Sequence, residues 1–144
     1  MKTLARKGEP SVSLDGKEEA FKGRYKVKDG RIIIDPKVKG DVRIETAKAY
    51  GGDVTIRFDF KPGPKCNNDL FFRGQKFDLA KGNLKNFTEG KWQSMEIVVK
   101  GENIEFTCDG ELQRKGKTKG KSGTPLGVRA EYGEIEFRNL RIKE

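Results

Sequence analysis

The stretch RYKVKDGRIIID (residues 24–35) decides the fold class. Tyr25 and Val27 alternate with cations, the pair Asp29-Gly30 follows, and a second run of β-branched residues begins. A two-residue type I′ turn needs positive φ at both positions, so Asp-Gly between two such runs is a strong hairpin signal. The sequence therefore predicts a β-hairpin here.

The same pattern recurs along the chain. Further short apolar runs are separated by the pairs Gly51-Gly52, Gly74-Gln75, Gly101-Glu102, Asp109-Gly110 and Gly133-Glu134. About ten short strands at this spacing are typical of an antiparallel sandwich or jelly roll. The best helical candidates, residues 17–23 and 84–87, are each a turn or two long. We therefore predict an all-β protein built as a two-sheet antiparallel β-sandwich.

Alternation also assigns the faces of the strands. The residues predicted to face the core are Val54, Ile56, Phe58, Phe60, Met95, Ile97, Val99, Ile135 and Phe137. Arg57, Asp59 and Glu96 fall on the opposite face of their strands. A sandwich buries one face of each sheet, so the other face of one sheet is free to form a concave binding surface.

Composition narrows the functional classes. The chain has 144 residues, 33% hydrophobic and 37% charged, with a net charge of +9 and no histidine. One domain is expected over residues 1–144, with residues 1–12 as a flexible N-terminal segment. The absence of histidine excludes Ser–His and Cys–His nucleophile pairs, histidine bases and histidine metal ligands. No apolar run approaches the roughly 18 residues of a membrane span.

The cysteines and the N-terminus give few further signals. Cys66 and Cys108 form no CxxC motif, so a zinc or redox site is not supported. Free thiols are expected, although spacing alone leaves a disulfide open. MKTLARKG (1–8) lacks the apolar stretch of a signal peptide. The sequence leaves the compartment open: we expect a cytoplasmic protein, or a secreted or periplasmic one if a signal was removed.

The net positive charge raises nucleic acid or an anionic surface as partners. The densest basic cluster is QRKGKTKGKSG (113–123). It fits a solvated glycine-rich loop, or a loop that tracks phosphates. No aromatic residue interleaves with its lysines, so base stacking is unsupported and nucleic acid is not the expected partner.

The closing EIEFRNLRIKE (134–144) resembles the C-terminal signature of the 3-keto-disaccharide hydrolase domain family, which belongs to the concanavalin A-like lectin/glucanase jelly rolls. Four further stretches resemble the family in the same order, at residues 13–17, 25–34, 51–74 and 90–112. The resemblance implies a concanavalin A-like jelly roll, a saccharide ligand or substrate, and glycosidase-like activity. The segment Gln75–Lys91 is shorter than its family counterpart, so the chain resembles a shortened member.

A 3-keto sugar has an acidified hydrogen at C2, and its removal gives an enolate that expels the glycosidic oxygen at C1. This chemistry needs a base, a donor or cation for the oxyanion, and a polar cleft, and no metal or cofactor is expected. Asp59, Arg73 and Asp78 are the predicted catalytic residues. The resemblance implies an acidic position at Asp59. Arg73 would hold the carbonyl or enolate oxygen, and Asp78 would act as base or acid.

The predicted substrate-binding residues are Arg57, Asn67, Asn68, Phe71 and Glu96. A structural interpretation also fits, in which Asp59 forms a cross-strand ion pair with Arg57 or Arg73. The run 67–69 could form a turn or a weak calcium cluster.

Three functions stay open at this point. The first is a hydrolase-like domain that acts on 3-keto glycosides, and the second is a non-catalytic carbohydrate-binding module. The third is a basic protein that binds anionic polysaccharide or nucleic acid. The short chain and the missing histidines favour the second, and the dispersal of the cations counts against the third.

Overall fold

The computed structural model describes residues 11–12, 18–118 and 122–144 as strands, turns and loops, without a helix among them. The strands in chain order are β1 (Ser11–Val12), β2 (Glu19–Ala20), β3 (Tyr25–Lys28), β4 (Arg31–Ile34), β5 (Val42–Glu45), β6 (Val54–Pro62), β7 (Asn67–Phe72), β8 (Gln75–Ala80), β9 (Gln93–Lys100), β10 (Asn103–Cys108), β11 (Glu111–Lys117), β12 (Gly127–Tyr132) and β13 (Ile135–Lys143). The predicted all-β class is confirmed.

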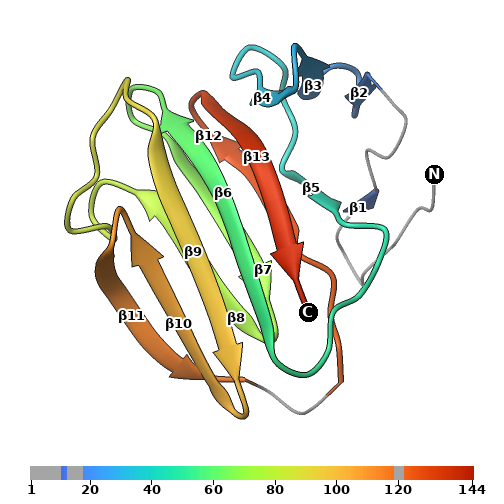
Figure 1. The fold of residues 1–144 in the computed structure, drawn as a ribbon. Helices are drawn as coiled ribbons and strands as arrows, with labels where there is room; N and C mark the ends of the chain where they lie inside the picture. Colours follow the sequence, from blue (N-terminus) through green and yellow to red (C-terminus); the bar gives the residue numbers. More distant parts are fainter. Residues whose placement is uncertain (1–10, 13–17, 119–121) are drawn as a thin grey trace.

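The strands form two sheets that pack face to face (Figure 1). One has five strands in the order β1-β5-β12-β7-β8, and the other has eight in the order β11-β10-β9-β6-β13-β4-β3-β2. All pairings are antiparallel except the short β1–β5 pair. In Figure 1 the long strands β6, β9 and β13 lie in front of β7, β8 and β12. The molecule is therefore the predicted two-sheet sandwich.

The predicted core residues fill the space between the sheets. All nine are buried, from Ile56 and Phe60 at full burial to Phe137 at the margin. The rings of Phe77 on β8 and Phe106 on β10 stack across the two sheets with centroids 4.5 Å apart. The Tyr25 hydroxyl of β3 lies 2.7 Å from the carbonyl oxygen of Val128 on β12, which joins the sheets by a hydrogen bond. Apolar packing and this bond hold the two layers in one register.

Several smaller expectations can be compared with the structure. Cys66 and Cys108 are buried free thiols, as expected. Burial raises the pKa of Cys66 to about 11 and of Cys108 to about 12, which keeps both sulfurs protonated. The flexible segment expected at residues 1–12 lies largely outside the described residues, although Ser11–Val12 form β1. The resemblance at 13–17 and part of the basic cluster, residues 119–121, also lie outside them.

Within the described parts of the chain, no helix is long and apolar enough to cross a membrane.

Candidate functional site

The candidate site lies on the outer face of the five-stranded sheet. In β7, Leu70 and Phe72 point into the core, so alternation turns Asp69 and Phe71 outward. Cross-strand pairing places Asp78 of β8 directly opposite Asp69. On the other side of β7, Arg129 of β12 pairs with Asp69. Three neighbouring strands therefore bring charged side chains to one place on a sheet face.

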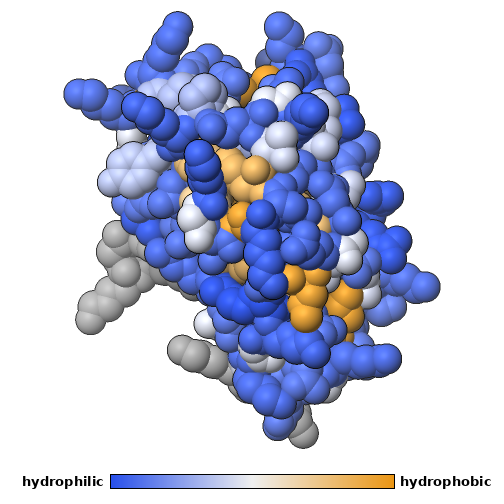
Figure 2. Space-filling view, turned by 90° about the vertical axis from the view of Figure 1, so that its left-hand side faces the viewer, coloured by the Kyte–Doolittle hydropathy of each residue, from blue (hydrophilic) through white to orange (hydrophobic). Residues whose placement is uncertain are grey.

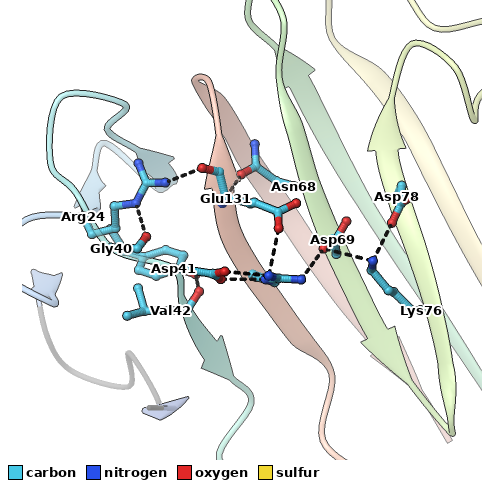
Figure 3. A network of polar contacts seen from close by, with 11 residues as sticks. Arg24, Gly40, Asp41, Val42, Asn68, Asp69, Lys76, Asp78 and Glu131 are labelled. Atoms are coloured by element: carbon cyan, nitrogen blue, oxygen red, sulfur yellow. Dashed lines mark hydrogen bonds and ion pairs between the residues drawn. The ribbon is translucent and has the colours of Figure 1, made fainter. Parts of the chain in front are cut away.

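Arg129 is the cationic centre of this face, and Figure 3 labels the three acids that it contacts, Asp41, Asp69 and Glu131. Its Nε and Nη2 atoms donate to the two carboxylate oxygens of Asp41, each at 2.6 Å. Nη1 donates to Asp69 Oδ2 at 3.2 Å, and Nη2 lies 2.8 Å from Glu131 Oε2. One guanidinium group thus forms ion pairs with three carboxylates.

Asp69 and Asp78 form the second half of the network. Lys76 Nζ lies 3.8 Å from Asp69 Oδ2 and 3.7 Å from Asp78 Oδ1 (Figure 3). The side chain of Asp69 is 1% exposed and that of Asp78 is 40% exposed. A buried carboxylate therefore lies beside a more accessible one, with the half-exposed ammonium group of Lys76 within 4 Å of both.

Asp69 is the most strongly perturbed acid of this face. Burial raises the pKa of Asp69 to about 7, and the neighbouring carboxyl group of Asp78 acts in the same direction. Among the described residues, Arg129 and Lys76 form the ion pairs with these four carboxylates, so one bound proton would relieve excess negative charge. Asp69 Oδ1 and Asp78 Oδ1 are buried and receive no hydrogen bond from the described residues. A proton between the two aspartates would satisfy both oxygens.

A pocket opens beside this network at the β7–β8 turn. It has a volume of about 360 Å³, and Phe71, Lys76, Thr124 and Pro125 are among its lining residues. The guanidinium of Arg43 lies 4.4 Å from the centre of the Phe71 ring and covers one side of it. Gly127 pairs with Phe71, and a Cβ there would meet Arg43 Cδ at 2.9 Å. The missing side chain thus leaves room for the arginine. Lys76 borders both the pocket and the carboxylates.

Three of the predicted site residues lie on this face. Asn67 and Phe71 of β7 and Asp78 of β8 all belong to the outward set of their strands. Asn68 does not, because its amide is fully buried and bonds to the backbone of β12. It donates to Tyr132 O at 2.9 Å and accepts from the N–H of Glu131 at 2.8 Å. Asn68 therefore fixes the strand pairing, and its side chain does not reach a ligand on this face.

Arg73 has a structural role, because its side chain binds backbone oxygens of a neighbouring loop. It lies in the turn between β7 and β8 with a φ of 50°, and not at the end of a strand. Its guanidinium is buried and donates to Tyr50 O at 3.1 Å and Gly52 O at 3.0 Å. These bonds hold the β5–β6 loop against the turn. The structure does not bring the Arg73 guanidinium to Asp78 or Asp59.

Asp59, Arg57 and Glu96 lie on the other sheet. Asp59 of β6 accepts hydrogen bonds from Ser94 Oγ at 3.0 Å, Asn139 Nδ2 at 2.9 Å and Arg138 Nε at 3.3 Å. Burial alone would raise its pKa, but these donors lower the pKa of Asp59 below its ordinary value. The structure therefore separates Asp59 from Asp78 by the whole core and leaves it a weak base.

The sequence allowed an ion pair of Asp59 with Arg57 or with Arg73. Neither forms, because the cationic partner of Asp59 is Arg138. Arg57 pairs instead with Glu96, with Nε 2.7 Å from Oε2. Both residues lie on the outer face of the eight-stranded sheet. The predicted site residues that reach an outer face are thus divided between two opposite faces, while Asn68 and Arg73 are buried.

Asp69, Lys76 and Arg129 were not among the predicted catalytic or substrate-binding residues. Alternation could have found Asp69 and Lys76, because Asp69 shares a face with Phe71 and Lys76 with Asp78. Arg129 could not be found this way, because its neighbours come from strands far away in the sequence. Among the described residues, no group of three or more histidines, cysteines or acids could hold a metal ion.

Comparisons with known structures agree with this architecture. A candidate glycosyl hydrolase from Parabacteroides distasonis ATCC 8503 is 17% identical, with a TM-score of 0.65, over 89% of this chain and 84% of that one. The carbohydrate-binding module CBM66 from Bacillus subtilis is 12% identical, with a TM-score of 0.57, over 83% and 86% of the two chains. The galectin LEC-6 from Caenorhabditis elegans is 12% identical, with a TM-score of 0.57, over 82% and 99%.

The fold is thus a two-sheet jelly-roll sandwich like that of these neighbours, which include a galectin. Residues 76–143 match the family model described as the 3-keto-alpha-glucoside-1,2-lyase-like domain. This match confirms the family resemblance predicted from the sequence, and it covers β8 to β13. No curated protein sequence matches the chain.

Proposed function

We propose that the outer face of the five-stranded sheet binds a 3-keto glycoside and cleaves it by β-elimination, with Asp69 and Asp78 as the acid–base pair. The observation that carries the proposal is that a buried carboxyl group lies directly opposite a partly exposed one, with an ammonium group within 4 Å of both. The raised pKa of the buried group supports it. Enzymes hold acids and bases in such paired environments, where the pKa values of the two groups are pushed apart.

The reaction can be written with these groups. Asp78, the accessible carboxylate, takes the proton from C2, and the electrons of the C–H bond form the enolate of the C3 ketone. The enolate then collapses to restore the ketone and form a C1–C2 double bond, while the C1–O bond breaks. The leaving oxygen takes a proton from the aspartate pair, which keeps its number of protons because Asp78 has just gained the proton of C2. The products are an unsaturated keto sugar and the free alcohol.

Lys76 has the role that sequence reasoning gave to Arg73. Its side chain is half exposed and borders the pocket that includes Phe71. An ammonium group placed beside the C3 oxygen would stabilise the negative charge that develops there. Phe71 would offer the partly open side of its ring to the sugar.

The test is incubation with a 3-keto-disaccharide, followed by detection of the released sugar and of the unsaturated ketone by its ultraviolet absorbance. Asp78→Asn should lower turnover about 10²–10⁴-fold, because it removes the base. Asp59→Asn is the matched control, since it removes a carboxylate from the opposite sheet. Its turnover should equal that of the unaltered protein. Equal loss in both variants, or loss in the control alone, would overturn the assignment.

A second function is supported by the burial of Asp69 and by the fold shared with a carbohydrate-binding module. The same face would then hold a saccharide without cleaving it. Saturable binding of the 3-keto-disaccharide, lost in Lys76→Gln and not accompanied by any product, would favour this function over the elimination.

A further inference from the structure

A second polar hollow lies on the opposite side of the molecule, on the outer face of the eight-stranded sheet. Its volume is about 180 Å³, and its lining residues are Arg57, Ser94, Met95, Glu96, Thr107, Gly110 and Arg141. They come from β6, β9, β10 and β13 and from the turn after β10. The core separates this hollow from the aspartate pair, so the two sites do not depend on each other.

A β-bulge in β13 positions Arg141, one of the two arginines that line the hollow. Arg138 of β13 pairs with Asp59 of β6, and Arg141 pairs with Arg57. Three residues along β13 therefore match two along β6, with Asn139 at a φ of 57° in the bulge. Without the extra residue, alternation would turn Arg141 toward the core. The bulge thus aims a second guanidinium at the surface next to the first.

This arrangement leaves positive charge uncompensated. Like charges directly opposite on neighbouring strands destabilise a sheet. Arg57 is balanced by Glu96, whose Oε2 lies 2.7 Å from its Nε. Arg141 donates only to the backbone oxygen of Asn139, at 3.1 Å, and forms no ion pair with any described residue. Two guanidinium groups therefore meet one carboxylate, and an external anion would complete the balance.

We propose that this hollow binds the oxyanion of an acidic saccharide, either a carboxylate or a sulfate group. The planar guanidinium fork of Arg141 matches such a group in two hydrogen bonds. Glu96 and the hydroxyl of Thr107 also line the hollow and suit the hydroxyl groups of the same sugar. The anion is bound at one point and not along a track, because the carboxylates of Glu96 and Asp59 interrupt the positive face. A nucleic acid would also meet no aromatic side chain in the hollow on which to stack its bases.

The experiment titrates four probes into the full chain: an oligogalacturonate, a heparin oligosaccharide, a neutral cello-oligosaccharide and a single-stranded DNA of matched charge. Arg141→Gln should weaken binding of at least one of the two acidic oligosaccharides about tenfold or more. Lys143→Gln removes one charge from the same strand outside the hollow, so it should change the affinity less than about twofold.

The two acidic probes separate the carboxylate source from the sulfate source. Arg141→Lys keeps the charge and loses the fork, so it should lose most of the same affinity. Equal weakening by Arg141→Gln and Lys143→Gln would overturn the proposal, because it would show diffuse charge attraction only. Tighter binding of DNA than of both acidic oligosaccharides, or no binding of either one, would overturn it as well. Thermal unfolding of each variant checks that the fold is intact.

Discussion

Asp69 is the residue at which folding stability and chemistry oppose each other. Its side chain is almost fully buried on an outer sheet face, beside another acid. A buried acid that holds its proton near neutral pH lowers stability when the proton leaves. An acid–base pair needs such a proton. The loss of folding stability that the burial of Asp69 causes is therefore consistent with a functional role.

This opposition predicts how stability depends on pH. The pKa of Asp69 rises from 3.8 to about 7 on folding. Between these values the folded protein holds a proton that the unfolded chain releases, so the contribution of Asp69 to stability falls as the pH rises from about 4 to about 7. Asp69→Asn has no charge to bury. It should be more stable than the unaltered protein above pH 7, by roughly 1–3 kcal/mol, and close to it near pH 4.

Urea unfolding at several pH values measures this difference, and Asp59→Asn serves as the control of opposite sign. The pKa of Asp59 is lowered on folding, so its stabilising effect is present at neutral pH and fades as the solution becomes acidic. Asp59→Asn should therefore lose stability at neutral pH. A profile of Asp69→Asn that runs parallel to that of the unaltered protein would contradict the assignment.

At the scale of the strands, local turn chemistry was predictable from the sequence. Asp29-Gly30 and Asp109-Gly110 both have positive φ at each position, as a two-residue hairpin turn demands. The turn expected at Gly74-Gln75 is one residue earlier, at Arg73-Gly74, because these two residues take the positive φ values. This shift explains why Arg73 is a turn residue and not a ligand at the end of a strand.

The pairing of strands distant in the sequence was not predictable. Each strand shows which residues alternate, but no local pattern says which sheet the strand joins. β6 and β7 are consecutive, yet β6 pairs with β9 and β13, and β7 with β8 and β12. For this reason Asp59 and Asp78 looked like neighbours in the sequence and lie on opposite faces in the structure. The residue types suited to sugar chemistry were predictable, and their grouping was not.

Gly133, in the turn between β12 and β13, tests how closely this turn packs against Cys66, which directly precedes β7. Gly133, in the β12–β13 turn, has a φ of 73°, and a Cβ there would lie 2.7 Å from Cys66 Cα. Gly30 has the same φ of 73°, but a Cβ there would meet nothing within 4 Å. Gly30→Ala should cost about 1 kcal/mol of unfolding free energy from backbone strain. Gly133→Ala should cost roughly 3 kcal/mol or more, because the backbone at Cys66 must also move.

Chemical denaturation of both variants measures this comparison. Equal losses would show that the β12–β13 turn does not pack against the start of β7 as described.

At the scale of the whole molecule, the net charge of +9 is spread over a polar surface. Figure 2 shows a side covered mostly by hydrophilic residues, with hydrophobic residues visible between them, chiefly across the middle of this side. Neither proposed site is a broad positive patch, because acids and cations alternate on both outer faces. A sandwich with two outer faces can hold two separate polar sites, and the sequence alone merged their residues into one.

The most direct test is chemical-shift mapping by NMR during a titration with a 3-keto-disaccharide. The account predicts that the largest changes fall on β7, β8 and β12, around Asp69, Lys76, Asp78 and Arg129. Changes concentrated instead around Asp59 and Ser94 on the eight-stranded sheet would contradict it and would restore the site expected from the sequence.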